Sequence, residues 1–535
     1  MGRPVRRKPR TANVEGAAFA YPGLGRWGSR LLLVALLAAG LSPPGQARGD
    51  DPDPAVPESS DGPAWDTFNY VKPAPVLRLR LGGEEAGAIA IATVGYLIVD
   101  PPPSLAGVPT PIRVWQKLTF QPGTWSFEAD PYGTNMEGHA AGGTVYYLIA
   151  RGNRVSIPEA FAWTFGAALM WELVEFREPV SINDLIMTPA GGLAIGEALT
   201  QLSGWFDRSG SNGLHKAFAW ILDFPKKLHD WMDGSRPVVD PVTAGWHEFQ
   251  VFGAAGFLQQ GSRSSPYYGV YQLGIQTRLF RVPDYGAPGR GQSTFVDGRV
   301  SRITLGWTFQ GGQLVDSIFD TETSVVGHYA RDIEGTEEEP RGWDVYLGVT
   351  AGYETGQHVW NVAEGSAPNR VALVRLPGIV LQPRLFQGKF EVDLGLETAL
   401  LFGGVDPLRS PPVESPPPGV AYPPVLVSQG YYYALGLRIA PSIQVRYGEL
   451  AIGAMARLDE FHAVTTGWNA VVIDGRMPTM VDRRGTAIAW ARVRLPNPPL
   501  EFGLRGEWSE RAGSVDDVSA SQQERVLAAS LSVMF

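Results

Sequence analysis

The chain contains no cysteine and carries little charge. Among its 535 residues there is no Cys, and Asp, Glu, Lys and Arg together make up 19%, against about 25% in soluble domains. The missing thiols exclude a disulfide framework, a Cys-ligated metal centre and a thiol nucleophile. The net charge of −9 and the lack of a basic face argue against nucleic-acid binding. Because 44% of the residues are hydrophobic, a disordered chain is also excluded.

Apolar runs long enough for a membrane-spanning helix are missing as well. The run at 31–41 has about 11 residues, fewer than the roughly 20 that such a helix needs. It follows a basic segment and precedes the small residues of a cleavage site, which predicts a secretory signal peptide over 1–47. The acidic, Pro-rich residues 48–64 are expected to form a disordered linker. Residues 65–130 form a mixed N-terminal region.

Residues 131–232 are predicted to be helical. Ser156 is expected to cap an apolar helix that begins at Pro158, and Ser181 to cap a second helix. Apolar residues cover nearly all faces of the first helix, so it should be buried in protein or lipid. An amphipathic third helix is expected over 217–231.

From Trp246 to Phe535 the hydrophobic pattern has a period of two. About twelve segments alternate, each long enough for the roughly 9–11 residues of a tilted membrane-spanning strand. Connectors alternate between long and short over the C-terminal half, but this alternation fails over 262–341. A soluble β-sandwich or propeller also has many short strands, yet it would carry more charge on its outer face and would show a repeat.

The last segment is the clearest strand. Its alternate apolar residues are Leu527, Ala529, Leu531, Val533 and Phe535. This pattern resembles the terminal-Phe signature of Gram-negative outer-membrane barrels, which the insertion machinery reads. The predicted fold is therefore mostly β: an antiparallel outer-membrane barrel of about twelve strands over 246–535. The helical segment is expected at or in the periplasmic opening, as a plug.

Two stretches of the helical region carry recognisable patterns. The first has an Asn…His…Tyr-Tyr…Arg pattern and the second a Trp-Glu…Glu…Ser-x-Asn-Asp…Gly-Glu pattern. The residues of these patterns are Asn135, His139, Tyr146, Arg151, Trp171, Glu172, Glu175, Ser181, Asn183, Asp184, Gly196 and Glu197. Both stretches resemble a bacterial envelope family of unknown function. Ala140 stands where the family has Pro, and Val180 is inserted before Ser181. The resemblance covers about 100 of the 535 residues. It implies an outer-membrane setting and supplies no activity.

Several acids of this region stand on apolar helices, where a charge must be paired, solvated or protonated. Glu172 and Glu175 share a helix face, and Asp184 lies in the next helix. Asn135 and His139 share a face if their stretch is helical. A histidine with two or three carboxylates could act as general acid and base or bind a divalent cation. The spacing matches no established metal signature, so a metal site stays open.

A structural explanation covers the same residues. In such a polar latch, Glu172 or Glu175 would pair with Arg151 or Arg177, and His139 would dock the segment into the barrel lumen by hydrogen bonds. The further members of the latch, or of a binding site, would be Asn135, Tyr146, Trp171, Ser181, Asn183, Gly196 and Glu197.

Two classes of function stay open. The first is a structural barrel or a channel in the outer membrane of a Gram-negative bacterium, with a helical plug. Its partners would be outer-membrane lipid and the barrel-insertion machinery, and a small solute or lipid could be its ligand. The second is a membrane-embedded hydrolase of envelope lipid or glycolipid, with His139 as base and Glu172, Glu175 or Asp184 orienting it. No G-x-S-x-G motif supports the enzyme. We expect no cofactor and no nucleic-acid partner.

Overall fold

The computed structural model describes most of the chain beyond its first 69 residues. The described residues are 70, 75–99, 111–121, 123–175, 179–209, 213–236, 246–262, 264–282, 284–359, 369–408, 424–464, 479–516 and 518–534. The predicted signal peptide, the linker and Phe535 lie outside these residues.

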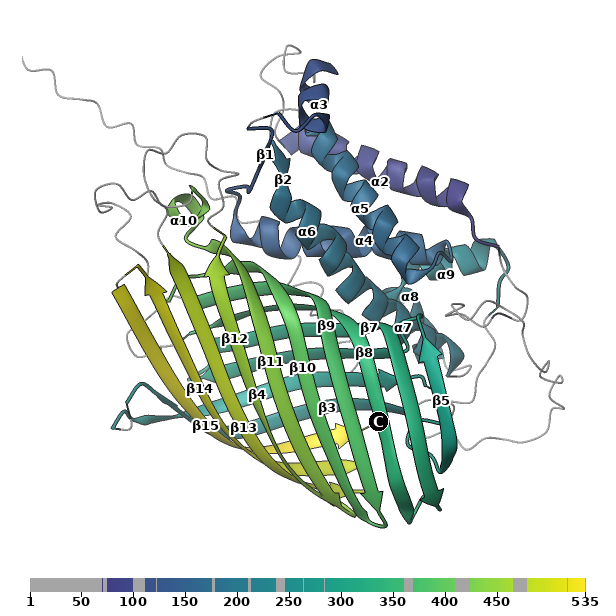
Figure 1. Ribbon diagram of the computed structural model, residues 1–535, viewed down its shortest axis with the longest axis vertical. Coiled ribbons are helices and arrows are strands. Elements are labelled where there is room, and N and C mark those ends of the chain that lie inside the picture. Colours follow the sequence, from purple (N-terminus) through teal and green to yellow (C-terminus); the bar gives the residue numbers. More distant parts are fainter. Residues whose placement is uncertain are drawn as a thin grey trace, which may run out of the picture.

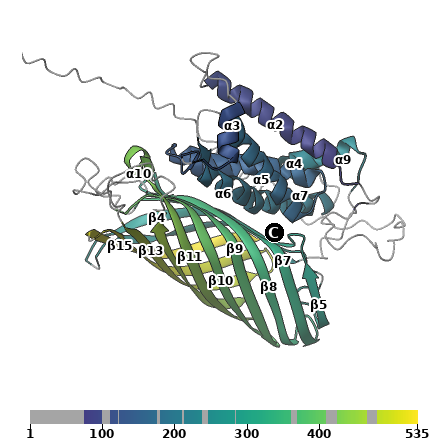
Figure 2. The same ribbon diagram turned by 45° about the horizontal axis from the view of Figure 1, so that its top comes forward.

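Twelve antiparallel strands close into a barrel (Figures 1 and 2). They are β3 (Trp246–Gln260), β4 (Tyr267–Phe280), β6 (Val300–Gln310), β7 (Gln313–Gly335), β8 (Pro340–His358), β9 (Asn369–Gln387), β10 (Phe390–Val405), β11 (Tyr432–Tyr447), β12 (Leu450–Ala463), β13 (Met480–Leu495), β14 (Leu500–Val515) and β15 (Val518–Met534). The last strand, β15, pairs with the first, β3, and so closes the ring. A short strand, β5 (Gly289–Phe295), pairs only with one end of β7. The predicted barrel of about twelve strands is confirmed.

Alternation along each strand separates the lumen from the outer face. On β11, Leu435, Leu437 and Ile439 are exposed, whereas Arg438 between them is buried. Successive side chains of a strand point to opposite faces, so the leucines and the isoleucine lie outside and the arginine lies in the lumen. Exposed Leu, Ile, Val and Trp side chains recur on the outer face of the other strands. Such a wall matches the low charge of the whole chain.

The two ends of the barrel differ in their connections. Tight turns at 336–339, 388–389, 448–449 and 496–499 join strands at one end, where β3 also begins and β15 ends. At the opposite end the connections include the long segments 359–368, 406–431 and 464–479. Short turns are typical of the periplasmic side of such barrels.

The predicted alternation of long and short connectors fails over 262–341 for two local reasons. Strand β5 lengthens the connection between β4 and β6 at the short-turn end. At the other end, Gly311 and Gly312 reverse the chain between β6 and β7 with φ of 56° and 83°. Glycine adopts these positive angles without steric cost, so this turn is shorter than the connector pattern suggests.

The helical domain precedes the barrel. Its elements are α2 (Arg78–Val99), α3 (Pro111–Leu118), β1 (Trp125–Ser126), η2 (Gly133–Gly138), α4 (His139–Gly152), α5 (Ile157–Val174), β2 (Val180–Ser181), α6 (Ile182–Gly191), η3 (Gly192–Gly196), α7 (Glu197–Arg208), α8 (Gly213–Leu222) and α9 (Phe224–Met232). A short helix, α10 (Pro424–Gln429), lies between β10 and β11. Among the described helices, none is both long and apolar enough to cross a bilayer.

The predicted helix starts follow from local capping. The Ser156 side chain accepts a hydrogen bond from the N–H of Glu159 at the start of α5. Ser181 does the same for Asp184 at the start of α6. A cap oxygen satisfies an N–H that has no partner within its helix, and this is a signal that the sequence alone shows.

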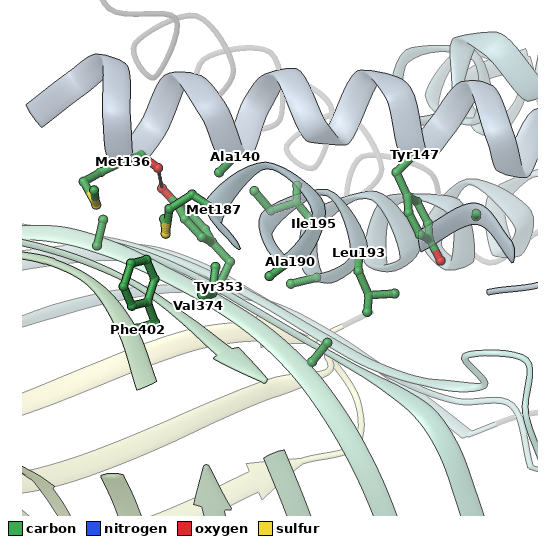
Figure 3. Packing of buried hydrophobic residues seen from close by; sticks show 14 of the residues in the cluster. Met136, Ala140, Tyr147, Met187, Ala190, Leu193, Ile195, Tyr353, Val374 and Phe402 are labelled. Carbon is green, nitrogen blue, oxygen red and sulfur yellow. Dashed lines mark hydrogen bonds between the residues drawn. The ribbon is translucent and has the colours of Figure 1, made fainter. Parts of the chain in front are cut away.

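The helical domain packs against the outer face of the barrel wall (Figures 1 to 3). Phe402 on β10 joins the apolar cluster of the helices, whereas its neighbour Leu401 belongs to a separate cluster on the other face of the strand. Figure 3 shows Phe402 and Val374 of the wall beneath Met136 of η2. Further along the wall, Phe206 of α7 packs with residues of β3, β4 and β6.

This position differs from the expected place at or in the periplasmic opening. Phe402 and Val374 offer an apolar surface to the helices, whereas the lumen holds charges that pair with one another. An apolar helix in the lumen would leave such buried charges without partners, which is costly. Hydrophobic periodicity alone does not distinguish an apolar wall from an apolar interior, so the sequence does not show which face the helices cover.

Candidate functional site

A histidine and four acids gather around the start of α6. His139 begins α4, Glu172 lies in the last turn of α5 and Glu175 follows that helix. Asp184 lies in the first turn of α6, and Glu128 follows β1. The structure thus brings together His139, Glu172, Glu175 and Asp184, which the sequence singled out, and adds Glu128.

His139 lies between two side chains of α6. Its Nε2 is 3.2 Å from Asp184 Oδ2, and its Nδ1 is 3.3 Å from Thr188 Oγ1. Asp184 and Thr188 are four residues apart, so both lie on the face of α6 that meets α4. Asn183 Nδ2 donates to the other Asp184 oxygen at 2.7 Å. Thr188 is not among the residues that the sequence patterns single out, although its spacing from Asp184 is a signal in the sequence.

Glu172 and Glu175 are held by contacts with the backbone. Glu172 is fully buried, and its Oε2 accepts the N–H of Ser181 at 2.6 Å. Lys117 Nζ donates to the carbonyl oxygens of Glu172 and Glu175 at 2.5 and 2.6 Å. These bonds join the end of α5, the start of α6 and α3, whereas the latch expected Glu172 or Glu175 to pair with an arginine.

Glu128 reaches the site through a very short element. Strand β1 pairs in parallel with β2 over two residues each. Asn183 Oδ1 then accepts the N–H of Glu128 at 2.9 Å. Potential ligand atoms, one from each residue, lie within 4.8 Å of one another in two groups. The groups are Glu128, His139 and Asp184, and Glu128, Glu172 and Glu175. A two-residue strand leaves no periodic pattern, so no signal in the sequence identifies Glu128.

Asn135 joins this region to the end of the barrel. Its Nδ2 donates to the hydroxyls of Tyr431 and Tyr433 at 2.9 and 2.7 Å. These hydroxyls in turn donate to the carbonyl oxygens of Asp130 and Glu128, at 3.0 and 2.9 Å. The barrel therefore fixes the segment that carries Glu128 and Asn135.

Arg151 pairs with a different acid from the one expected. Its Nε is 2.8 Å from Glu197 Oε2, and Tyr147 donates to the same oxygen at 2.9 Å. The latch paired Arg151 with Glu172 or Glu175, and its other candidate, Arg177, lies outside the described residues. The reason is the helix arrangement: Glu197 opens α7 directly opposite the face of α4 that carries Tyr147 and Arg151.

Three other residues of the resemblance stand apart from the cluster. Tyr146 is half-buried on α4, and the charge of Glu85 on α2 contributes, after burial, to raising its pKa. Trp171 is half-buried on α5. Gly196 lies where a Cβ would come within 2.6 Å of the Tyr147 ring. The small size of Gly196 is thus required for packing.

Burial and mutual repulsion set the electrostatics of the site. Burial, and then the negative charges of Glu128, Glu172 and Glu175, raise the pKa of Asp184 well above its usual range. Burial lowers the pKa of His139 to about 4. Near neutral pH the imidazole is therefore uncharged, with one nitrogen able to donate and the other able to accept a proton.

A second polar region fills part of the barrel lumen. Glu354 on β8 binds Arg438 on β11 at 2.8 Å and Arg457 on β12 at 2.7 Å. Since β8 and β12 are not neighbours in the sheet, these bonds cross the lumen. Other charged residues of the network are Arg302, Asp320, Glu322, Arg375, Glu397 and Asp459.

One known family matches the helical part. Residues 124–224 match the model of a domain of unknown function (DUF3943). This range contains the histidine and the four acids of the candidate site. A comparison with curated proteins gave no match.

Solved barrels resemble the chain only distantly. The translocator domain of the autotransporter NalP from Neisseria meningitidis is 10% identical, with a TM-score of 0.20, over 54% of this chain and 88% of that one. The β domain of the Bordetella autotransporter BrkA is 13% identical, with a TM-score of 0.22, over 55% and 100%. The outer-membrane protein Omp33 of Acinetobacter baumannii is 9% identical, with a TM-score of 0.18, over 55% and 99%. We base the barrel fold on the strand pairing itself.

Proposed function

We propose that the protein is a closed structural barrel of the Gram-negative outer membrane, which holds its helical domain against the outer wall. The observation that carries this proposal is the bonding of Glu354 to Arg438 and Arg457 across the lumen. Ion pairs between strands on different sides of the lumen stabilise a narrow barrel and obstruct the passage of solutes. The other member of this class of function, a channel, needs an open path through the same region.

The predicted signal peptide and the alternating last strand support export and membrane insertion as parts of this proposal. The predicted signal peptide over 1–47 directs the chain out of the cytoplasm. The alternating last strand, up to Phe535, supplies the segment that the barrel-insertion machinery reads. The exposed apolar side chains of the wall then contact outer-membrane lipid.

The experiment measures ion and solute flux in liposomes that contain the full-length protein. We expect no flux with the wild type and measurable flux when Arg438→Ala and Arg457→Ala are combined, since Glu354 then loses its two partners across the lumen and keeps the pair with Arg375 on the neighbouring strand β9. The control is Arg483→Ala, which removes an exposed pair with Glu460 on the same barrel. Wild-type flux comparable to that of an open porin would overturn the structural proposal in favour of the channel.

A second candidate function, the hydrolase, is favoured by the geometry of His139. Its neutral ring would take a proton at Nδ1 as general base, while Nε2–H donates to Asp184, which orients the ring. The contacts of Glu172 with the backbone give that residue a positioning role instead. A substrate from the membrane, an envelope lipid or glycolipid, suits a site on a domain that lies against the apolar outer wall.

Mass spectrometry of outer-membrane lipids incubated with the full-length protein tests this second candidate. An enzyme should release a fatty acid or sugar product, and His139→Gln should abolish the release. His229→Gln serves as the control, because His229 pairs with Glu84 away from the cluster. Lipids left unchanged by the folded wild type would exclude the hydrolase.

A further inference from the structure

The donor atoms around α6 form two adjoining groups that share Glu128. One comprises Glu128, His139 and Asp184, and the other Glu128, Glu172 and Glu175. Within each group, the potential ligand atoms lie within 4.8 Å of one another. Three carboxylates therefore face each other in the second group, beside a histidine and a fourth carboxylate.

The first group has the dimensions of a small coordination site. An ion with tetrahedral bonds of about 2.1 Å places its ligand atoms roughly 3.4 Å apart. His139 Nε2 and Asp184 Oδ2 are already 3.2 Å apart. The second nitrogen of the ring faces the Thr188 hydroxyl at 3.3 Å, and such a contact on the far side of the imidazole fixes the orientation of histidine ligands.

The surroundings of the cluster favour a positively charged ligand. Lys117 Nζ donates to the backbone carbonyl oxygens of Glu172 and Glu175. Asn135, four residues before His139 on the same helical stretch, is fully buried. Its Oδ1 has no hydrogen-bond partner within the described part of the chain, while its Nδ2 binds both tyrosine hydroxyls.

We propose that Glu128, His139 and Asp184 bind one divalent transition-metal ion. An imidazole beside carboxylates is a ligand set for ions such as Zn²⁺ or Mn²⁺, whereas Ca²⁺ and Mg²⁺ prefer oxygen ligands alone. The bound ion neutralises the carboxylates and joins β1, α4 and α6 at one point. This site is independent of the lumen network, so the flux experiment above does not bear on it.

Isothermal titration calorimetry of the full-length, metal-stripped protein with Zn²⁺ tests the site. We expect one ion per chain and at least a 100-fold weaker affinity in each of His139→Gln and Asp184→Asn. His229→Gln is the matched control, since His229 pairs with one carboxylate, Glu84, outside the cluster. It should bind Zn²⁺ as the wild type does. Equal binding by wild type and His139→Gln would overturn the proposal, as would an equal loss in His229→Gln.

A second measurement on the wild type covers the case in which a variant fails to fold. Co²⁺ in place of Zn²⁺ gives visible absorption bands whose strength reports low coordination number with nitrogen and oxygen ligands. We expect these bands to saturate at one Co²⁺ per chain and to vanish when Zn²⁺ is added. Co²⁺ that shows only the weak bands of the hydrated ion would overturn the proposal. Ca²⁺ in tenfold excess should not displace Co²⁺, and displacement would contradict the choice of metal.

Discussion

Glu197 is fully buried at the start of α7, and its carboxylate binds Arg151, Tyr147 and Gln201. Removing one partner of a buried ion pair leaves an uncompensated charge. We therefore expect Glu197→Gln to lower the free energy of unfolding of the helical domain by about 3–5 kcal/mol. Urea titration followed by tryptophan fluorescence measures the change.

The matched control for Glu197 is another Arg–Glu pair of the same domain. Glu159 binds Arg78, whose side chain is 62% exposed. Since an exposed pair contributes at most about 1 kcal/mol, Glu159→Gln should be nearly neutral. If both substitutions lowered the free energy of unfolding equally, burial would not determine how much the Arg151–Glu197 pair stabilises the domain.

Glu85 on α2 makes the stability of the helical domain depend on pH. Burial raises the pKa of this carboxyl to about 7, from an ordinary 4.5. The folded state therefore binds the proton more tightly than the unfolded state. The stability that this difference contributes is complete below about pH 4.5 and is lost as the pH rises through 7. We expect Glu85→Gln to stabilise the domain at pH 8, by up to roughly 3 kcal/mol, and to have no effect at pH 4.

Melting temperatures of wild type and Glu85→Gln, measured by circular dichroism from pH 4 to 8, test this expectation. The two curves should coincide at low pH and diverge above about pH 5. A constant difference over the whole range would show that Glu85 titrates normally. Glu84→Gln serves as the comparison for Glu85→Gln on the same helix, because Glu84 is partly exposed and pairs with His229.

At the scale of elements, α4 and α6 approach each other through glycines. A Cβ on Gly143 would lie 1.8 Å from the carbonyl oxygen of Thr188, whereas a Cβ on Gly142 would have nothing within 4 Å. We expect Gly143→Ala to separate α4 from α6 and to destabilise the domain by about 1–3 kcal/mol or more. Gly142→Ala should be neutral or slightly stabilising. Hydrogen exchange of the α6 amides measures the separation, and equal protection in both variants would contradict it.

The sequence predicts helices and strands better than it predicts the tertiary contacts between them. Ser156 and Ser181 mark helix starts because capping depends on neighbours within four residues. The strands are visible because their two faces meet different surroundings. Glu128 joins the site through two parallel residue pairs and a bond to Asn183, and such contacts depend on tertiary packing. The pairing of Arg151 with Glu197, and not with Glu172, also depends on tertiary packing.

At the scale of the whole molecule, the position of the helices on the outer wall has a direct test. Thr355 Oγ1 on β8 donates to Glu137 Oε1 at 3.2 Å. Because the chain has no native cysteine, the pair Glu137→Cys and Thr355→Cys introduces the only two thiols. We expect a short bifunctional maleimide to join them in nearly all molecules. The control pair is Glu137→Cys with Leu504→Cys, which lies on the exposed outer face of β14. The maleimide should not join these two thiols. Efficient joining of the control pair would place the helices elsewhere.

The helical domain comes first in the chain, yet the surface that receives it is built from strands far apart in the sequence. Its wall residues belong to strands from β3 to β11, from Phe249 to Tyr433. No single hairpin of the barrel offers this surface, so the domain reaches its full contact area only when strands from both clusters are paired. A chain in which β8 to β11 fail to pair would therefore leave part of the apolar helices exposed to water.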